Sequence, residues 1–203
     1  EAEVALRASL DLARDSATHR LPNTYRNLGV LLDLMGRPEA GLPLLDSALV
    51  LLRERGGDGP AEEAVMEVYR ALLLVHGGRV AAGARVIATA GGRALADLPP
   101  TDPRRSDVGL AMGIAHLHAG DHLPAEARFA SAAATADRTY PPGHPGRAAP
   151  RCALAVVRVL LDRTEGAHPD LAGSVCDAAA AWGLTHPILR SALTRAREHA
   201  GVR

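Results

Sequence analysis

Residues 25–48 read YRNLGVLLDLMGRPEAGLPLLDSA, and this stretch decides the fold. Large apolar residues such as Leu28 and Leu32 recur three or four positions apart, which is the spacing of one face of an α-helix. Gly36 ends that helix, and Pro38 begins a second one, because proline is tolerated in the first turn of a helix. The stretch therefore predicts two helices joined by a short turn.

The same pattern returns every 42 residues. Five columns agree in residue size at this step over four units, and glycines and large apolar residues carry the register. The columns are Leu28-Gly29, Arg70-Ala71, Met112-Gly113 and Leu154-Ala155; Gly36, Gly78, Gly120 and Asp162; Gly41, Gly83, Ala125 and Ala167; Leu45, Ile87, Phe129 and Leu171; and Ala48, Ala90, Ala132 and Ser174. A fixed period in this range predicts a solenoid built from repeated helix pairs.

Glycine and proline divide the chain into ten expected helices. They lie near residues 1–14, 23–35, 39–55, 61–76, 80–90, 105–118, 122–138, 146–162, 169–182 and 187–200. Gly91-Gly92 is expected to end or kink the fifth helix and to leave residues 93–98 as a stub, because two glycines cost about 2 kcal/mol relative to alanine. Pro43 is expected in the first turn of its helix, since proline further in removes a hydrogen bond.

The composition excludes several classes of function. The 23 basic and 23 acidic residues balance, so the chain has no net charge with which to attract nucleic acid or an anionic membrane. The few aromatic residues exclude a base-stacking platform, and no apolar run reaches the roughly 18 residues of a membrane span. Cys152 and Cys176 are too few for a disulfide framework, and we expect buried free thiols, although the two could approach. These features predict a cytoplasmic protein.

The repeated columns resemble tetratricopeptide (TPR) repeats, whose pattern places a large residue, Leu-Gly or Leu-Ala, a turn glycine, a small residue, a large apolar residue and Ala in this order. Residues 25–48 fit it column by column, and residues 113–132 fit nearly as well. The 42-residue step resembles the longer variant found in kinesin light chain and in sensor arms of bacterial transcription regulators. Gly143-His144-Pro145 resembles the Gly-x-x-His-Pro linker of that variant, whereas Arg70 occupies a normally apolar column.

The resemblance implies an all-α fold, a right-handed α-solenoid of TPR helix hairpins with about ten helices and a C-terminal capping helix. It implies one superhelical domain over residues 1–203. Within it, residues 1–21 resemble the second helix of a preceding half-repeat, so that the chain is expected to start in mid-repeat. The repeats then cover residues 22–60, 61–102, 103–144 and 145–184, and the capping helix covers residues 185–203.

The resemblance also implies a binding surface, because TPR arrays bind through a concave wall lined by the first helix of each repeat. The partner-binding positions carried over onto this sequence are Asn23, Arg26, Asn27, Val30, Tyr69, Leu72, His76, Asp107, Leu110, Ile114 and His118. The same transfer places Asp33, Val65, Val68 and Val75 on the wall. Asn27 is an amide that can hydrogen-bond a peptide backbone, and Arg26 is either a carboxylate ligand or a solvated surface residue.

The resulting functional prediction is a non-catalytic protein-interaction scaffold. It binds a peptide or helix of a partner protein in its concave groove, as the C-terminal arm of a bacterial regulatory protein. The alternative is a small-molecule inducer-sensing TPR domain of a transcriptional regulator, with an apolar lining of Val30, Tyr69, Leu72, Leu110 and Ile114. The oligomeric state stays open.

No catalytic or cofactor motif occurs, and no enzyme activity, cofactor or metal is expected. His116, His118 and His122 suggest a metal site at first sight. Residues two apart point to different sides of a helix, however, and Gly120 interrupts the geometry. We therefore interpret the three histidines as surface and turn residues.

Overall fold

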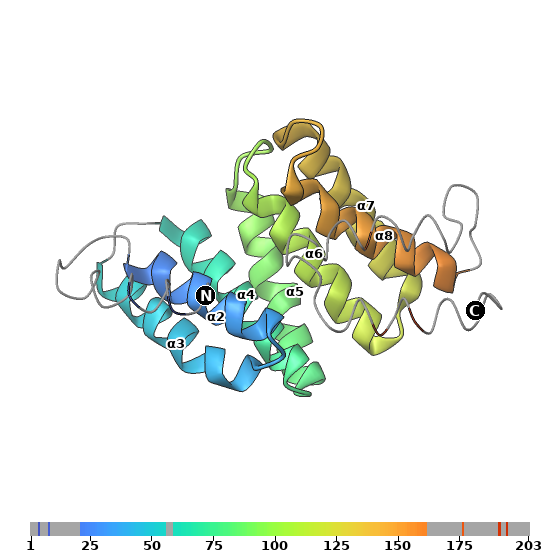
Figure 1. Ribbon diagram of the computed structural model, residues 1–203. Helices are drawn as coiled ribbons and strands as arrows, with labels where there is room; N and C mark the ends of the chain where they lie inside the picture. The colour runs from blue at the N-terminus through green and yellow to red at the C-terminus, as the bar shows by residue number, and fades with distance from the viewer. Residues whose placement is uncertain are drawn as a thin grey trace. The chain divides into compact units, whose positions relative to one another are not determined.

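The computed structural model describes residues 21–55 and 59–161, together with Val4, Ala8, Cys176, Ser191 and Thr194. The described part of the chain is all-helical and contains seven α-helices, which Figure 1 labels, and one 3-10 turn. The chain divides into two compact units, with the boundary between Asp97 and Leu98. The expected helices near 1–14, 169–182 and 187–200, including the capping helix, lie outside the described residues apart from these single positions.

The first unit contains four of these helices. They are α2 (Leu21–Leu34), α3 (Pro38–Arg55), α4 (Gly59–His76) and α5 (Val80–Asp97). Helix α2 packs on α3, and α4 packs on α5, while α4 also contacts α3 and α2. The unit is therefore two consecutive helix hairpins.

The second unit contains the remaining elements. They are α6 (Arg104–Ala119), α7 (His122–Thr139), the 3-10 turn η1 (Pro145–Arg147) and α8 (Ala148–Leu160). Helix α6 packs on α7, and α7 packs on α8. His144 caps η1, because its Nδ1 accepts a hydrogen bond from the Gly146 N–H at 3.0 Å, and its ring stacks on that of Tyr140.

The turn glycines of the 42-residue pattern share one conformation. Gly36, Gly78 and Gly120 have φ values of 74°, 83° and 81°. In each case the residue after the glycine donates its backbone N–H to the carbonyl five residues earlier: Arg37 to Leu32, Arg79 to Leu74, and Asp121 to His116, at 2.8 to 3.0 Å. This is the Schellman ending of a helix, and it requires a left-handed residue that glycine adopts without strain.

The small and large residues of the other columns contact each other where the paired helices cross. A Cβ added to Gly29 would overlap Leu45, and one added to Gly113 would overlap the ring of Phe129. Leu45, Ile87 and Phe129 are all within 1% of complete burial. The small residue on one helix therefore leaves the space that the large residue of the next helix fills.

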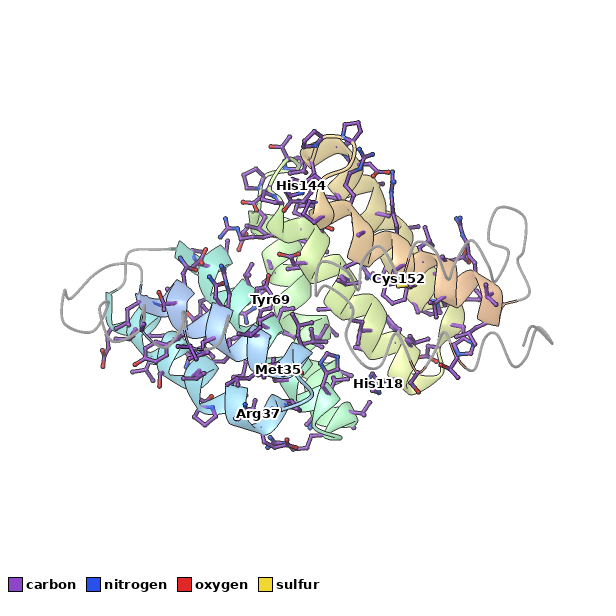
Figure 2. The ribbon with its side chains drawn as sticks, viewed as in Figure 1. Met35, Arg37, Tyr69, His118, His144 and Cys152 are labelled. Carbon is purple, nitrogen blue, oxygen red and sulfur yellow. A yellow bond between two sulfur atoms is a disulfide. The ribbon has the colours of Figure 1, made fainter. Side chains whose placement is uncertain are left out.

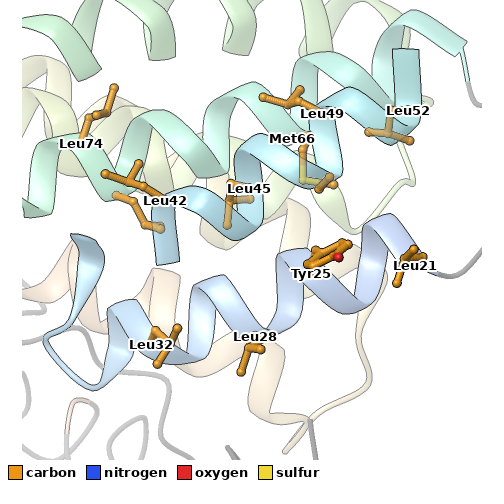
Figure 3. Packing of buried hydrophobic residues seen from close by; sticks show 12 residues of the cluster. Leu21, Tyr25, Leu28, Leu32, Leu42, Leu45, Leu49, Leu52, Met66 and Leu74 are labelled. Atoms are coloured by element: carbon orange, nitrogen blue, oxygen red, sulfur yellow. The ribbon is translucent and has the colours of Figure 1, made fainter. Parts of the chain in front are cut away.

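The core of the first unit continues this packing from the first hairpin onto α4. Its buried cluster combines α2, α3 and α4, as Figure 3 shows, and consists of Leu21, Tyr25, Leu28, Leu32, Leu42, Leu45, Ala48, Leu49, Leu52, Met66, Leu73 and Leu74. The cluster contains one aromatic ring. Aliphatic residues at helical spacing thus build most of this core.

The structure corrects two local predictions. Helix α5 runs unbroken from Val80 to Asp97, so Gly91-Gly92 does not end it. Ile87, Ala90 and Ala94 are buried, and this packing outweighs the intrinsic penalty of the two glycines. Pro43 lies in the second turn of α3, not the first, and α3 continues because Leu42 and its apolar neighbours are buried.

A third correction concerns the cysteines. Cys152 of α8 and Cys176 form a disulfide, with their Cα atoms 4.8 Å apart and exposures of 0% and 3%. We predicted free thiols, because sequence spacing alone does not show that two buried cysteines meet at bonding distance. One ground for the cytoplasmic prediction, the free thiols, is thereby removed.

Candidate interaction surface

Two stripes of predicted wall residues lie on α2 and α4 of the first unit. Their spacing of three and four positions places each set on one side of its helix. The α2 set lies opposite the buried stripe that includes Leu28 and Leu32. Asn23 and Asn27 are exposed, and the other members are partly buried. We call this surface the α2–α4 face, and it consists of Asn23, Arg26, Asn27, Val30, Tyr69 and Leu72.

Arg26 joins the two stripes of the α2–α4 face. Its guanidinium carbon lies 5.5 Å from the ring centre of Tyr69, which is a cation–π distance. Its Nε and Nη2 donate to the Asn27 side-chain oxygen at 3.3 Å each. Tyr69, labelled in Figure 2, also packs against the buried cluster. The α2–α4 face therefore presents an arginine that is positioned by hydrogen bonds and an aromatic ring that packs on the core.

His76 has a different environment from the one the sequence suggested. Its side chain is 1% exposed, and its Nδ1 lies 2.7 Å from Oδ2 of Asp33, whose side chain is 4% exposed. Asp33 and His76 come from α2 and α4, the first helices of consecutive repeats. This buried pair links the two helices, so that neither side chain offers a contact surface. Val65, Val68 and Val75 are buried as well.

Four partner-binding positions predicted for the second unit lie on α6. Asp107 is exposed, Leu110 and His118 are partly buried, and Ile114 is 3% exposed and belongs to the core. Burial raises the pKa of Tyr140, and the carboxylates of Asp107 and Asp102 raise it further. Asp107 therefore contributes to the electrostatic environment of the turn that follows α7.

The histidines of α6 and α7 show no metal-binding arrangement. His116 Nδ1 lies 3.7 Å from the carboxylate of Asp121, at the end of α6. Among the described residues, no group of three or more His, Cys, Asp or Glu side chains is placed to hold a metal ion. Nor is any helix in the described ranges long and apolar enough to cross a membrane.

A charged pocket lies outside the predicted wall, between α3, α4 and α5. Its volume is about 510 Å³, and its lining consists of Asp46, Leu49, Val50, Arg53, Glu67, Arg70 and Val86. The wall transfer did not include these residues, because most of them lie on second helices. The signal for the pocket was Arg70, which stands in a column that holds Leu28, Met112 and Leu154 in the other units.

Ion pairs hold the charged side chains of this pocket. Arg70 pairs with Asp46 through Nε. Arg53 pairs with Glu63 at 2.6 Å and with Glu67 at 3.2 Å, and the second oxygen of Glu67 pairs with Arg93. The hydrogen bond and charge of Glu63 raise the pKa of Arg53.

Solved structures with the same arrangement of helices identify the fold. A variant of the Podosopora anserina kinesin light chain candidate with nearly identical TPR-like repeats matches with a TM-score of 0.61 and 18% identity, over 88% of this chain and 86% of that one. BtubC (BKLC) from P. vanneervenii matches with a TM-score of 0.61 and 16% identity, over 98% and 91%. A second structure of the Podosopora anserina protein gives 0.51 and 14%, over 89% and 84%.

These similarities define a class of fold: the chain has the TPR-like fold of kinesin-light-chain-like repeats. At these identities they bear on the fold alone. No protein-family model matches the sequence, and a search of curated proteins finds no relative.

Proposed function

We propose that the protein is a non-catalytic interaction scaffold that binds a peptide or helix of a partner protein through the α2–α4 face. The observation that carries the proposal is the contact between Arg26 and Tyr69 on adjacent first helices of a TPR-like fold. Arginine and tyrosine are the residue types that dominate the energetics of protein interfaces. Here both are partly buried, so that little side-chain entropy remains to be lost on binding.

The chemistry of the face favours a partner segment with apolar and polar positions in alternation. Val30 and Leu72 supply partly exposed aliphatic contacts, and Asn23 supplies an exposed amide that donates and accepts hydrogen bonds. The oxygen of Asn27 accepts from Arg26, and its amide nitrogen is a donor for the partner. An amphipathic helix or an extended peptide meets both requirements. The proposal assigns no reaction to this surface.

Peptide selection on the purified chain tests the proposal. Peptides selected from a displayed random library should bind at least about tenfold more weakly to Arg26→Glu and to Leu72→Asp, because both changes alter the centre of the face. Arg79→Glu and Ala82→Asp are matched controls, since both residues are exposed and lie outside the α2–α4 face. Peptides that bind the face variants and the wild type equally well would exclude this surface.

A further inference from the structure

The pocket between α3, α4 and α5 is separate from the α2–α4 face and is not explained by the repeat fold. Arg70 lines it, in the column where Leu28 is 0% and Met112 is 6% exposed. The side chain of Arg70 is 34% exposed and reaches across to Asp46 of α3. The other described units form the same hairpin with an apolar residue at this position, so the fold itself does not require the arginine.

The side chains of Arg70 and Asp46 each keep hydrogen-bonding groups that their mutual contact does not use. Within the described residues, the only hydrogen bond of their side chains joins Nε of Arg70 to Oδ1 of Asp46. The two Nη nitrogens of Arg70 and Oδ2 of Asp46 are therefore available to a ligand, and the Nη groups form a fork that matches a carboxylate. Glu67, by contrast, uses one oxygen for Arg53 and the other for Arg93.

The charge balance of the lining restricts the ligand. Two arginines and two carboxylates line the pocket, so a simple anion meets Asp46 and a simple cation meets Arg70. A ligand that carries both charges satisfies both groups without adding net charge. Leu49, Val50 and Val86 complete the lining with an apolar surface, and Val50 is 51% exposed.

We propose that this pocket binds a free α-amino acid with an apolar side chain. The α-carboxylate accepts hydrogen bonds from the Nη groups of Arg70, the α-ammonium donates to Oδ2 of Asp46, and the side chain packs on Val50 and its apolar neighbours. A free amino acid carries both charged groups on one carbon, which suits the adjacent, hydrogen-bonded side chains of Arg70 and Asp46. In a peptide the two termini are separated by at least one residue of about 3.8 Å.

Calorimetric titration of the full chain with L-leucine and two single-charge analogues tests the ligand class. 4-Methylpentanoate lacks the ammonium group, and 3-methylbutylamine lacks the carboxylate. We expect leucine to bind, and each analogue to bind at least about tenfold more weakly, because each leaves one charged group of the pocket unmatched. Absence of leucine binding at millimolar concentration, or equal binding of an analogue, would overturn the proposal. Tighter binding of leucyl-leucine would do so as well, since it would indicate a peptide site.

Arg70→Leu is the sharpest variant, because it restores the apolar residue type of the repeat column and should keep the fold. We expect it to keep or raise the melting temperature and to lose leucine binding by at least about tenfold. Arg79→Leu is the matched control and should bind leucine as the wild type does. Asp46→Asn should weaken leucine binding but leave the weak binding of 4-methylpentanoate unchanged or stronger. Unchanged leucine binding by folded Arg70→Leu would contradict the assignment.

Discussion

The second hairpin (α4–α5) and the third hairpin (α6–α7) cross in the same way, but the glycine that allows the close contact lies on a different helix in each. In the α4–α5 hairpin, Gly83 lies so close to α4 that an added Cβ would stand 2.6 Å from the carbonyl oxygen of Ala71. In the α6–α7 hairpin, Gly113 instead leaves space for the ring of Phe129. Ile87 is the smaller counterpart of Phe129. The comparison shows that the fold constrains the combined size of the residues at the crossing, while the position of the glycine varies.

The same two hairpins differ at the residue before the crossing. Met112 of α6 is 6% exposed and belongs to the core, whereas Arg70 of α4 lines a pocket and pairs with Asp46. The crossing that follows is preserved in both hairpins. A departure from the repeat pattern at one column therefore changes the surface chemistry without changing the fold.

The largest effect is expected at the large residue of the third hairpin. Phe129→Ala should lower the free energy of unfolding by about 3–5 kcal/mol, because it removes a completely buried ring and leaves a cavity beside Gly113. Urea denaturation followed by circular dichroism measures this. Leu123→Ala, at a 55% exposed position of the same helix, should change the unfolding free energy by no more than about 0.5 kcal/mol. Similar losses in both variants would mean that Phe129 does not support the crossing.

The glycine of the second hairpin provides the next test. Gly83→Ala should destabilise the protein by about 1–3 kcal/mol, because the new methyl group meets a backbone carbonyl that cannot rotate away. Gly92→Ala in the same helix is the control. A Cβ there has no atom within 4 Å, so the substitution should stabilise the protein by about 0.4–1 kcal/mol. Thermal denaturation of both variants decides, and a stabilising Gly83→Ala would contradict the close crossing.

The turn glycines should tolerate substitution less well than their exposure suggests. Gly120→Ala is expected to cost about 1–2 kcal/mol, because φ is 81° and a Cβ is strained in that region. No neighbour lies within 4 Å of the added methyl group, so the loss comes from the backbone alone. Gly120→Asn should recover part of it, since asparagine adopts left-handed conformations more readily. Equal unfolding free energies for alanine and wild type would argue against the Schellman ending.

The smallest effect is expected from Asp102, which precedes α6. The hydrogen bond from the Arg104 side chain holds the pKa of Asp102 below its ordinary value of 3.8. A carboxyl whose folded pKa is lowered stabilises the protein above the unfolded pKa, and this contribution is lost as the pH falls through the folded value. Asp102→Asn should therefore reduce the loss of stability below about pH 4. Identical pH profiles of melting temperature would exclude this contribution.

The sequence predicted the parts of the fold that depend on local pattern. The boundaries of the α2–α3 and α6–α7 hairpins follow from apolar spacing and turn glycines, and the Schellman turns fall at the glycine column. The sequence did not predict that α5 continues through Gly91-Gly92. Local propensity gives the penalty of the two glycines, but it does not show that Ile87 is buried and that its packing outweighs this penalty. Local propensity is thus a weaker guide than burial.

Contacts between distant residues were predictable only in part. The transfer of TPR wall positions placed Arg26 and Tyr69 on one surface, and the structure brings them together. It also placed Asp33 and His76 there, and the structure brings these two together as well, but the transfer did not show that the pair is buried. The disulfide between Cys152 and Cys176 depends on the same kind of tertiary information.

A double-mutant cycle at the crossing of the third hairpin tests the central claim most directly. Gly113→Ala and Phe129→Leu together reproduce the Ala155 and Leu171 pair of the fourth unit. Each single change should destabilise the protein, Gly113→Ala by overlap and Phe129→Leu by lost volume. The loss of unfolding free energy in the double variant should be smaller than the sum of the two single losses by about 0.5 kcal/mol or more. Strictly additive losses would contradict the account, since they would show that the small and large columns do not pack against each other.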